Sequence, residues 1–364
     1  MNSIRKLFDI LLDHYGPQHW WPCQTGVRWE IITGAILTQN TAWTNVEKAI
    51  GNLLAAKVME LVGIAESDDA ARAAAEQAGR EVAWTDPYKM IDELDFDILG
   101  IGDAYGKRGA LAIAALKAGK HVIADKPLCT TLEELSEIRQ LAAEKNLSVG
   151  MMLSLWSDPN PTAAKQLIAS GKVGEIQSIV VTAQHPLNYG TRPDWYWNSQ
   201  LHGGTINDIA PHAVDMVEFL TGCKFVKINS ARVWNSNFPE VPTFQNGAQF
   251  MAQLDNGAGV MGDVSYFSSG FGLPFYWRFG IWGTNGYLEF NIADPGVTLV
   301  EKGVPGIRKV YPGKADTNYL DEFLKEIKGG TPEFFNTPHV LDLSEFSLKL
   351  QAEADRTFQP GVYS

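Results

Sequence analysis

Cysteine is scarce in this sequence: Cys23, Cys129 and Cys223 are the three among 364 residues. Their number is odd, they lie far apart, and no two of them have the spacing of metal ligands. The sequence therefore predicts neither a disulfide framework nor a metal site. Isolated thiols of this kind are typical of a reducing compartment, so we expect a cytoplasmic protein.

The sequence also lacks a membrane-length apolar run and the apolar core of a signal peptide. Acidic residues outnumber basic residues, so the net charge is −12 and the pI is about 5.1. Such a surface has little capacity to neutralise phosphates, so we expect no nucleic-acid partner and no membrane partner. The hydrophobic content of 45% and the length favour two folded domains.

A glycine-rich phosphate turn is missing where a dinucleotide-binding domain should begin, because no G-x-G-x-x-G precedes residue 57. Residues 100–106, with three glycines between a strand pattern and a helix pattern, could substitute for it. Alternatively, residues 30–37 form a surrogate first strand and residues 38–41 a polar turn, whose side chains would obstruct a pyrophosphate. In a third alternative the first strand is lost and cofactor binding is weak or absent.

From residue 57 onward, strand patterns alternate with helix patterns, as in βαβ units. We expect strands at 59–65, 96–101, 121–124 and 147–153, and helices at 70–79, 108–119 and 131–146. Thr131 and Glu134 form a capping box that opens the last of these helices. Residues 57–155 are therefore predicted to form an α/β unit, a Rossmann-type parallel sheet whose first strand is replaced or missing.

Beyond residue 155 the strand patterns are longer and richer in aromatic and β-branched residues. The expected strands are 176–184, 225–234, 249–254, 260–266 and 277–282. These patterns predict that residues 156–364 form a second, α+β domain with a large, mostly antiparallel sheet and C-terminal helices.

One strand pattern ends abruptly at Asp125-Lys126-Pro127. Proline has no N–H and a fixed φ, so the strand must stop there, and Lys126 lies at its carboxyl end, where open α/β sheets bind ligands. After a double glycine, Asp208 and His212 are four residues apart and share one face of a predicted helix. A lysine, a carboxylate and a histidine could therefore converge.

These two motifs resemble those of the Gfo/Idh/MocA family of glucose-fructose oxidoreductases and inositol dehydrogenases, whose members carry Glu-Lys-Pro and Asp-x-x-x-His. The resemblance covers roughly residues 57–360, with further matches at 280–290 and 319–324, and it departs from the family at Asp125, where glutamate is usual. In that family the open sheet of the second domain makes subunit contacts. The resemblance thus implies a homo-oligomer, a dimer or tetramer.

The activity that the resemblance implies is NAD-dependent hydride transfer between a nicotinamide cofactor and a hydroxyl of a sugar, inositol or glycoside. His212, with a pKa near 6.5, would remove the hydroxyl proton, and Lys126 would stabilise the oxygen. Asp208 would orient the histidine or hold a neighbouring hydroxyl. The alternative is a non-catalytic sugar or nucleotide sensor, or a defective fusion, on the same fold.

Glu66 ends the strand pattern at 59–65, where an acidic residue binds the adenosine ribose of NAD. No cation for a 2′-phosphate follows it, so NAD is favoured over NADP; the alternative is a carboxylate that merely stabilises a helix N-terminus. Arg108 is either close to the nicotinamide end or an exposed helix residue. The other cofactor-binding candidates are Gly102, Asp103, Tyr105, Asp125 and Lys126.

A substrate-binding segment is predicted at residues 185–198, which are dense in aromatic and hydrogen-bonding side chains. Aromatic faces stack on sugar C–H surfaces, while Arg, Asn and His bind hydroxyls. The alternative is an aromatic cluster of the core or of an interface. The candidates in this segment are His185, Arg192, Trp195, Tyr196 and Asn198.

Residues 1–56 follow a different pattern: apolar residues between 4 and 12 repeat at helical spacing, and after a Gly-Pro break a second helical pattern runs from 29 to 54. The segments 14–22 and 34–48 resemble the opening helices of endonuclease III-like DNA glycosylases. The hairpin, the catalytic Asp or Lys and the four-cysteine cluster of those enzymes do not follow. A truncated glycosylase-like protein is thus the third functional hypothesis, and we expect no base-excision activity.

Overall fold

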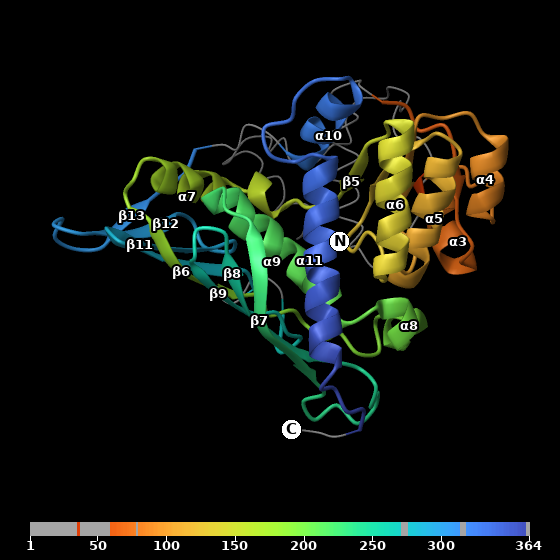
Figure 1. Cartoon of the computed structure of the whole chain (residues 1–364). Helices are drawn as coiled ribbons and strands as arrows, with labels where there is room; N and C mark the ends of the chain where they lie inside the picture. Colours follow the sequence, from red (N-terminus) through yellow and green to blue (C-terminus); the bar gives the residue numbers. More distant parts are fainter. Residues whose placement is uncertain (1–34, 37–58, 78, 271–275, 314–317, 362–364) are drawn as a thin grey trace, which may run out of the picture.

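Two sheets with a long helix between them organise the chain (Figure 1). The computed structural model describes residues 35–36, 59–77, 79–270, 276–313 and 318–361. The long helix is α11 (Thr337–Asp355), which packs against elements of both units. In the described ranges no helix has the length and apolarity that a membrane span requires.

The first sheet is parallel and has the strand order β2-β1-β3-β4-β5. Its strands are β1 (Ala35–Ile36), β2 (Ile64–Ala65), β3 (Ile98–Ile101), β4 (His121–Ala124) and β5 (Val149–Met151). The short strand β1 lies between β2 and β3, in the place of a first Rossmann strand. A surrogate strand from the segment 30–37 therefore replaces it, and loss of the strand is the wrong alternative. The expected polar turn at 38–41 lies outside the described residues.

The four helices described in this unit are α3 (Asp69–Gln77), α4 (Pro87–Glu93), α5 (Tyr105–Lys117) and α6 (Leu132–Lys145). One half of the predicted capping box is present, since Thr131 Oγ1 accepts a hydrogen bond of 3.2 Å from the Glu134 N–H; the Glu134 carboxylate accepts from the neighbouring Thr130 N–H at 3.3 Å. Helix α4 was not expected; Asp86 caps it and Pro87 occupies its first turn.

The second sheet has eight strands in the order β13-β12-β11-β10-β6-β9-β8-β7. All neighbours are antiparallel except β6 and β9, which confirms the mostly antiparallel prediction. The strands are β6 (Ile176–Thr182), β7 (Phe225–Trp234), β8 (Gly247–Leu254), β9 (Gly259–Asp263), β10 (Arg278–Gly283), β11 (Gly286–Asn291), β12 (Val297–Glu301) and β13 (Arg308–Val310).

Helices α7 (Pro159–Ala169) and α9 (Thr205–Thr221) pack on one face of this sheet (Figure 1). The opposite face carries exposed apolar side chains, including Met251 and Met261, which are 52% and 51% exposed. The remaining helices are η1 (Leu155–Ser157), η2 (Asp194–Trp197), α8 (Ser199–His202) and α10 (Tyr319–Ile327).

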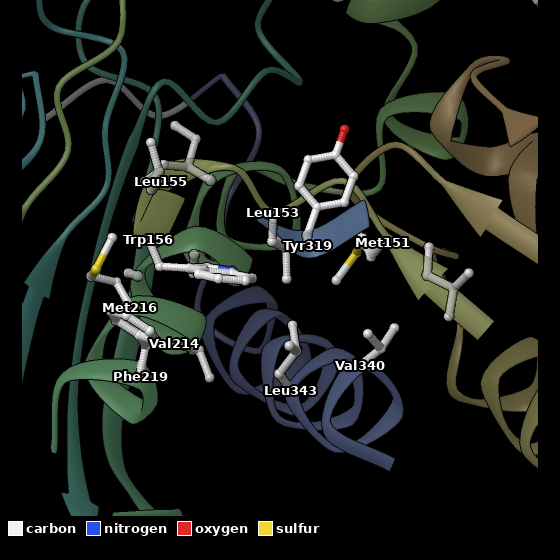
Figure 2. Close-up of a cluster of buried hydrophobic side chains, with 14 of the residues drawn as sticks. Met151, Leu153, Leu155, Trp156, Val214, Met216, Phe219, Tyr319, Val340 and Leu343 are labelled. Atoms are coloured by element: carbon white, nitrogen blue, oxygen red, sulfur yellow. The ribbon is translucent and has the colours of Figure 1, made fainter. Parts of the chain in front are cut away.

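A continuous hydrophobic cluster joins the two units (Figure 2). Met151 at the end of β5, Trp156 of η1 and Phe219 of α9 are all buried, and the rings of Trp156 and Phe219 lie 5.4 Å apart. Leu343 of α11 and Tyr319 of α10 complete it. This packing links α9, through η1 and α11, to the sheet whose strand β4 leads to Lys126.

Candidate active site

The turn after β4 carries Lys126, and Arg108 of α5 stabilises this turn through hydrogen bonds. The Arg108 side chain is 1% exposed. Its guanidinium donates to the carbonyl oxygens of Asp103 at 2.7 Å and Lys126 at 2.6 Å, and lies 3.4 Å from the Asp125 carboxylate. Arg108 is therefore a buried support of the turn, and its interpretation as an exposed helix residue is wrong.

Asp208, in the first turn of α9, forms polar contacts with residues of both units. One of its oxygens, Oδ1, forms an ion pair with Lys126 Nζ. The other, Oδ2, accepts hydrogen bonds from the hydroxyls of Tyr196, at 3.0 Å, and Tyr266. Burial alone would raise the pKa of Asp208, but the Lys126 ammonium and the His202 ring hold it well below its ordinary value. Asp208 is thus a charged, buried carboxylate.

His212 lies one turn further along α9, with its ring edge-on to Trp277 at 5.6 Å. Its Nδ1 atom is buried and finds no hydrogen-bond partner in the described part of the chain. Burial, with the positive charge of Lys126 and the nearby His185, places the pKa of His212 well below its ordinary value. The ring is therefore neutral at neutral pH, and the expected pKa near 6.5 is wrong.

Three of the five substrate candidates lie beside Asp208. Tyr196 is buried and donates to the carboxylate, so it is not an open stacking surface. The Arg192 guanidinium covers the Tyr196 ring at 4.1 Å and donates to the Leu187 carbonyl at 2.9 Å. Burial, followed by the Lys126 charge, lowers the pKa of His185 to about 3, so this ring is also neutral.

The other two candidates have local packing or capping contacts. Trp195 packs edge-on against Tyr105, with ring centroids 5.0 Å apart. The Asn198 side chain caps α8, accepting from the Gln200 N–H at 2.9 Å. Asn198 is exposed, and its side-chain amide oxygen already has this capping role.

Two residues of the site were not predicted from the sequence. Tyr266 follows β9, and its hydroxyl lies 2.7 Å from that of Tyr196. His202 ends α8, and its Nε2 is 3.4 Å from the Tyr266 hydroxyl. Burial lowers the pKa of His202, so its ring is neutral. The position of Tyr266 at the end of a strand pattern was a weak signal, and His202 had none.

The cofactor candidates gather at the carboxyl ends of neighbouring strands. Glu66 follows β2, Gly102 and Asp103 follow β3, and Asp125 follows β4. Tyr105 is buried as the first residue of α5. Because β1 lies between β2 and β3, these residues surround the edge where a Rossmann sheet binds its ligand.

Glu66 has the features of an acceptor for a hydroxyl-bearing ligand. Its Oε1 accepts from the Asp68 N–H at 2.8 Å, whereas the buried Oε2 has no partner among the described residues. Burial raises the pKa of Glu66 to about 7, and the nearby Asp103 carboxylate adds to this effect. Two ribose hydroxyls would supply the missing donors, so the residue fits NAD.

The three-glycine segment 100–106 is not the phosphate turn. It follows β3, which lies beside the surrogate first strand, rather than following that strand itself. A Cβ atom on Gly106 would lie 2.5 Å from the Gln200 carbonyl oxygen, so this glycine permits close packing of α5 against α8. Among the described residues, no cluster of His, Cys, Asp and Glu could hold a metal ion.

The N-terminal resemblance to DNA glycosylases is confirmed as a partial one. A Methanocaldococcus jannaschii protein assigned to the DNA repair glycosylases is 53% identical over 66 residues. This match covers 18% of the present chain and 29% of that protein. It is therefore a likeness to a fragment of a glycosylase.

The larger resemblance is confirmed over both units. Levoglucosan dehydrogenase of Pseudarthrobacter phenanthrenivorans is 29% identical over 283 residues, which are 69% of this chain and 71% of that protein. A solved levoglucosan dehydrogenase in complex with NADH and levoglucosan shares the fold, with a TM-score of 0.73 and 22% identity over 90% of this chain and 98% of that one.

Two family models cover most of the chain. The model of the oxidoreductase family's NAD-binding Rossmann fold matches residues 33–152, which include the surrogate first strand. The GFO/IDH/MocA C-terminal domain model matches residues 162–289, which include Asp208 and His212. The chain therefore belongs to the GFO/IDH/MocA family of NAD-binding oxidoreductases.

Proposed function

We propose that this protein oxidises a hydroxyl group of a sugar or polyol with NAD, and that Lys126 and His212 carry out the proton chemistry. The observation that carries the proposal is the ion pair between Lys126 and Asp208. It joins the two units at the carboxyl edge of the Rossmann sheet, one helical turn from a neutral histidine.

In this reaction the bound nicotinamide supplies the acceptor for the hydride that leaves the substrate carbon. His212 accepts the hydroxyl proton; because its Nδ1 is buried, Nε2 is the atom that receives it. Lys126 donates a hydrogen bond to the same oxygen and stabilises its developing negative charge. Asp208 anchors the lysine, since both of its oxygens already have partners.

For the cofactor, we propose that Glu66 binds the adenosine ribose and that Gly102, Asp103 and Tyr105 border the cofactor. The unpartnered Oε2 of Glu66 supports this assignment. A 2′-phosphate would place a second negative charge beside a buried acid, so NAD is preferred to NADP.

For the substrate, the side chains beside Lys126 favour a neutral, hydroxyl-rich molecule. His185 and His212 are neutral rings that can hydrogen-bond hydroxyls, and Arg192 adds a donor next to aromatic faces. The relative named for levoglucosan, an anhydrosugar, supports the same class.

A sensor that binds these ligands without turnover is the second candidate function. It is favoured by the sequence Leu37-Thr-Gln-Asn-Thr41, which contains none of the glycines that a phosphate-binding turn uses. Absorbance of NADH at steady state separates the two functions. The screen uses levoglucosan, inositols and hexoses with NAD, together with calorimetric titration of NAD and NADH. Binding without turnover of any of these would favour the sensor.

We further propose that the protein is a cytoplasmic homo-oligomer, a dimer or tetramer, and that it binds neither membranes nor nucleic acid. Its partner surface is the exposed face of the large sheet, where Val180, Met251 and Met261 border a hollow of about 400 Å³. Three isolated cysteines without the spacing of a disulfide framework support a reducing compartment.

A further inference from the structure

Asp208 is held by more donors than an ion pair with a lysine requires. Its Oδ2 accepts from two phenols that arrive from different segments, Tyr196 in η2 and Tyr266 after β9. Both rings are buried, with 0% and 3% exposure, and their hydroxyls lie 2.7 Å apart.

A buried carboxylate in a low-dielectric site stays charged only when its lone pairs are satisfied. Lys126 satisfies one oxygen of Asp208, and it is the residue that must also reach the substrate. If the second oxygen lacked donors, the carboxylate could rotate or take up a proton, and the Lys126 ammonium would lose its anchor. Two phenols that each offer one proton prevent both outcomes.

We propose that Tyr196 and Tyr266 are positioning residues, which fix Asp208 as an oriented carboxylate and thereby aim Lys126 at the substrate oxygen. This inference rests on the proposed function for its kinetic consequence, but the charge state of Asp208 can be tested without any substrate. It also changes the assignment of Tyr196 from a substrate-binding residue to a support of the catalytic lysine.

The other groups that face Asp208 do not replace the phenols. His202 is neutral because burial lowers its pKa; its ring helps to hold the pKa of Asp208 low, but its Nε2 lies 3.7 Å from Oδ2, farther than either phenol oxygen. Of the more distant titratable groups, His185 and His212 are also neutral, and burial raises the pKa of the phenols Tyr105 and Tyr276. Arg192 is the remaining cation, and its Nε and Nη2 donate to the backbone carbonyls of Leu187 and Pro186.

The test removes only the two hydroxyls, through Tyr196→Phe, Tyr266→Phe and the double variant. Tyr319→Phe, another buried tyrosine outside this cluster, is the matched control. The carboxyl carbon of Asp208 is followed by ¹³C NMR as a function of pH and assigned by its loss in Asp208→Asn. The parent and the control should keep a carboxylate signal down to about pH 4. The double variant should titrate at least about one pKa unit higher than the parent.

The kinetic arm uses the substrate found in the screen. Each single variant should lower kcat about tenfold with little change in KM, because an oriented donor is lost and substrate contacts are not. An unchanged Asp208 titration in the double variant would overturn the proposal, as would unchanged kcat in an active enzyme. If the titration moves but no substrate is turned over, the positioning of Asp208 stands and the proposed activity fails.

Discussion

Arg108 donates a hydrogen bond of 2.6 Å to the main-chain carbonyl of Lys126, although 18 residues separate them. The guanidinium also reaches the carbonyls of Asp103 and Pro127, at 2.7 and 3.3 Å. A fully buried arginine thus uses its planar set of donors to satisfy the backbone of the turn that carries the candidate catalytic lysine.

Replacing this residue, as in Arg108→Met, should lower the free energy of unfolding by about 3 kcal/mol or more, because several buried carbonyls lose their donor. Urea denaturation measures this loss. Arg139→Met is the control, since Arg139 is 38% exposed and forms surface ion pairs. Arg139→Met should lower the free energy of unfolding by less than about 1 kcal/mol. Equal losses in the two variants would contradict the supporting role of Arg108.

Once a substrate is identified, His212→Ala should lower the rate of oxidation by ~10²–10⁴, because the proton acceptor is lost. Lys126→Met should lower it by ~10²–10³ through loss of the donor to the substrate oxygen. Initial rates measured by NADH absorbance test both values. The exposed Lys349→Met is the control and should keep the parental rate. Near-parental turnover in either site variant would place the chemistry elsewhere.

The charge of Lys126 also controls the titration of His212. In the parent, burial and this ammonium depress the pKa of the ring, so oxidation should show no rise centred near pH 6.5. In Lys126→Met the positive neighbour is gone, and the His212 ring should titrate at higher pH than in the parent. Proton NMR of the imidazole Cε1–H measures the shift. A lower or unchanged value would contradict the proximity of the two groups.

The catalytic motifs were predictable because they depend on local rules. Proline does not continue a central strand, and β4 ends at Ala124, just before Asp125-Lys126-Pro127; a four-residue spacing places Asp208 and His212 on one helical face. The capping box at Thr131 follows from the same local chemistry. Each of these features depends on residues that are close in the sequence, and the structure has the strand end, the helix and the cap at these positions.

The surroundings of Asp208 were not predictable, because they depend on contacts between distant segments. Tyr266 is 58 residues from Asp208 in the sequence, and no local pattern marks its hydroxyl as a donor to that carboxylate. Tyr196 was predicted to stack on a ligand, but its ring is buried in the protein. The strand Ala35–Ile36 is two residues long, too short for a period-two pattern; the sequence offered 30–37 as one alternative, and the parallel pairing with β2 and β3 decides in its favour.

Glu66 should make stability depend on pH. Its folded pKa of about 7 lies above the ordinary 4.5, so between these values the folded state binds more protons than the unfolded state. The stabilisation from Glu66 is therefore present at low pH and lost as pH rises through this window. In Glu66→Gln this dependence should disappear, whereas the exposed Glu76→Gln should retain it. Thermal denaturation from pH 4 to 8 tests the slope, and a parental slope in Glu66→Gln would contradict the assignment.

The N-terminal segment should have no base-excision activity. The match to a glycosylase covers 29% of that protein, and the sequence has three cysteines, too few for the four-cysteine cluster that many of those enzymes carry. When the protein is incubated with a duplex containing an oxidised or mismatched base, cleavage of the duplex should not exceed that in a buffer blank. Cleavage that disappears on deletion of residues 1–56 would contradict this expectation.

The exposed face of the large sheet should form the subunit interface. Met251 and Met261 are direct cross-strand neighbours, and Met261 is in turn paired with Val180. Further along the sheet, Trp282 pairs with Tyr287, which pairs with Val300. Apolar side chains thus extend across several strands on one uncovered face, an arrangement that favours association with a second copy.

Glutamates at both methionine positions, Met251→Glu with Met261→Glu, should dissociate the oligomer, because two buried charges per subunit would face an apolar partner. The fold should survive, since both side chains are about half exposed in the single chain. Analytical ultracentrifugation gives the mass, and circular dichroism checks the fold. Ile307→Glu is the control, because Ile307 is 77% exposed and lies between β12 and β13. A monomeric parent protein, or an oligomer that persists in the double variant, would rule out this face as the interface.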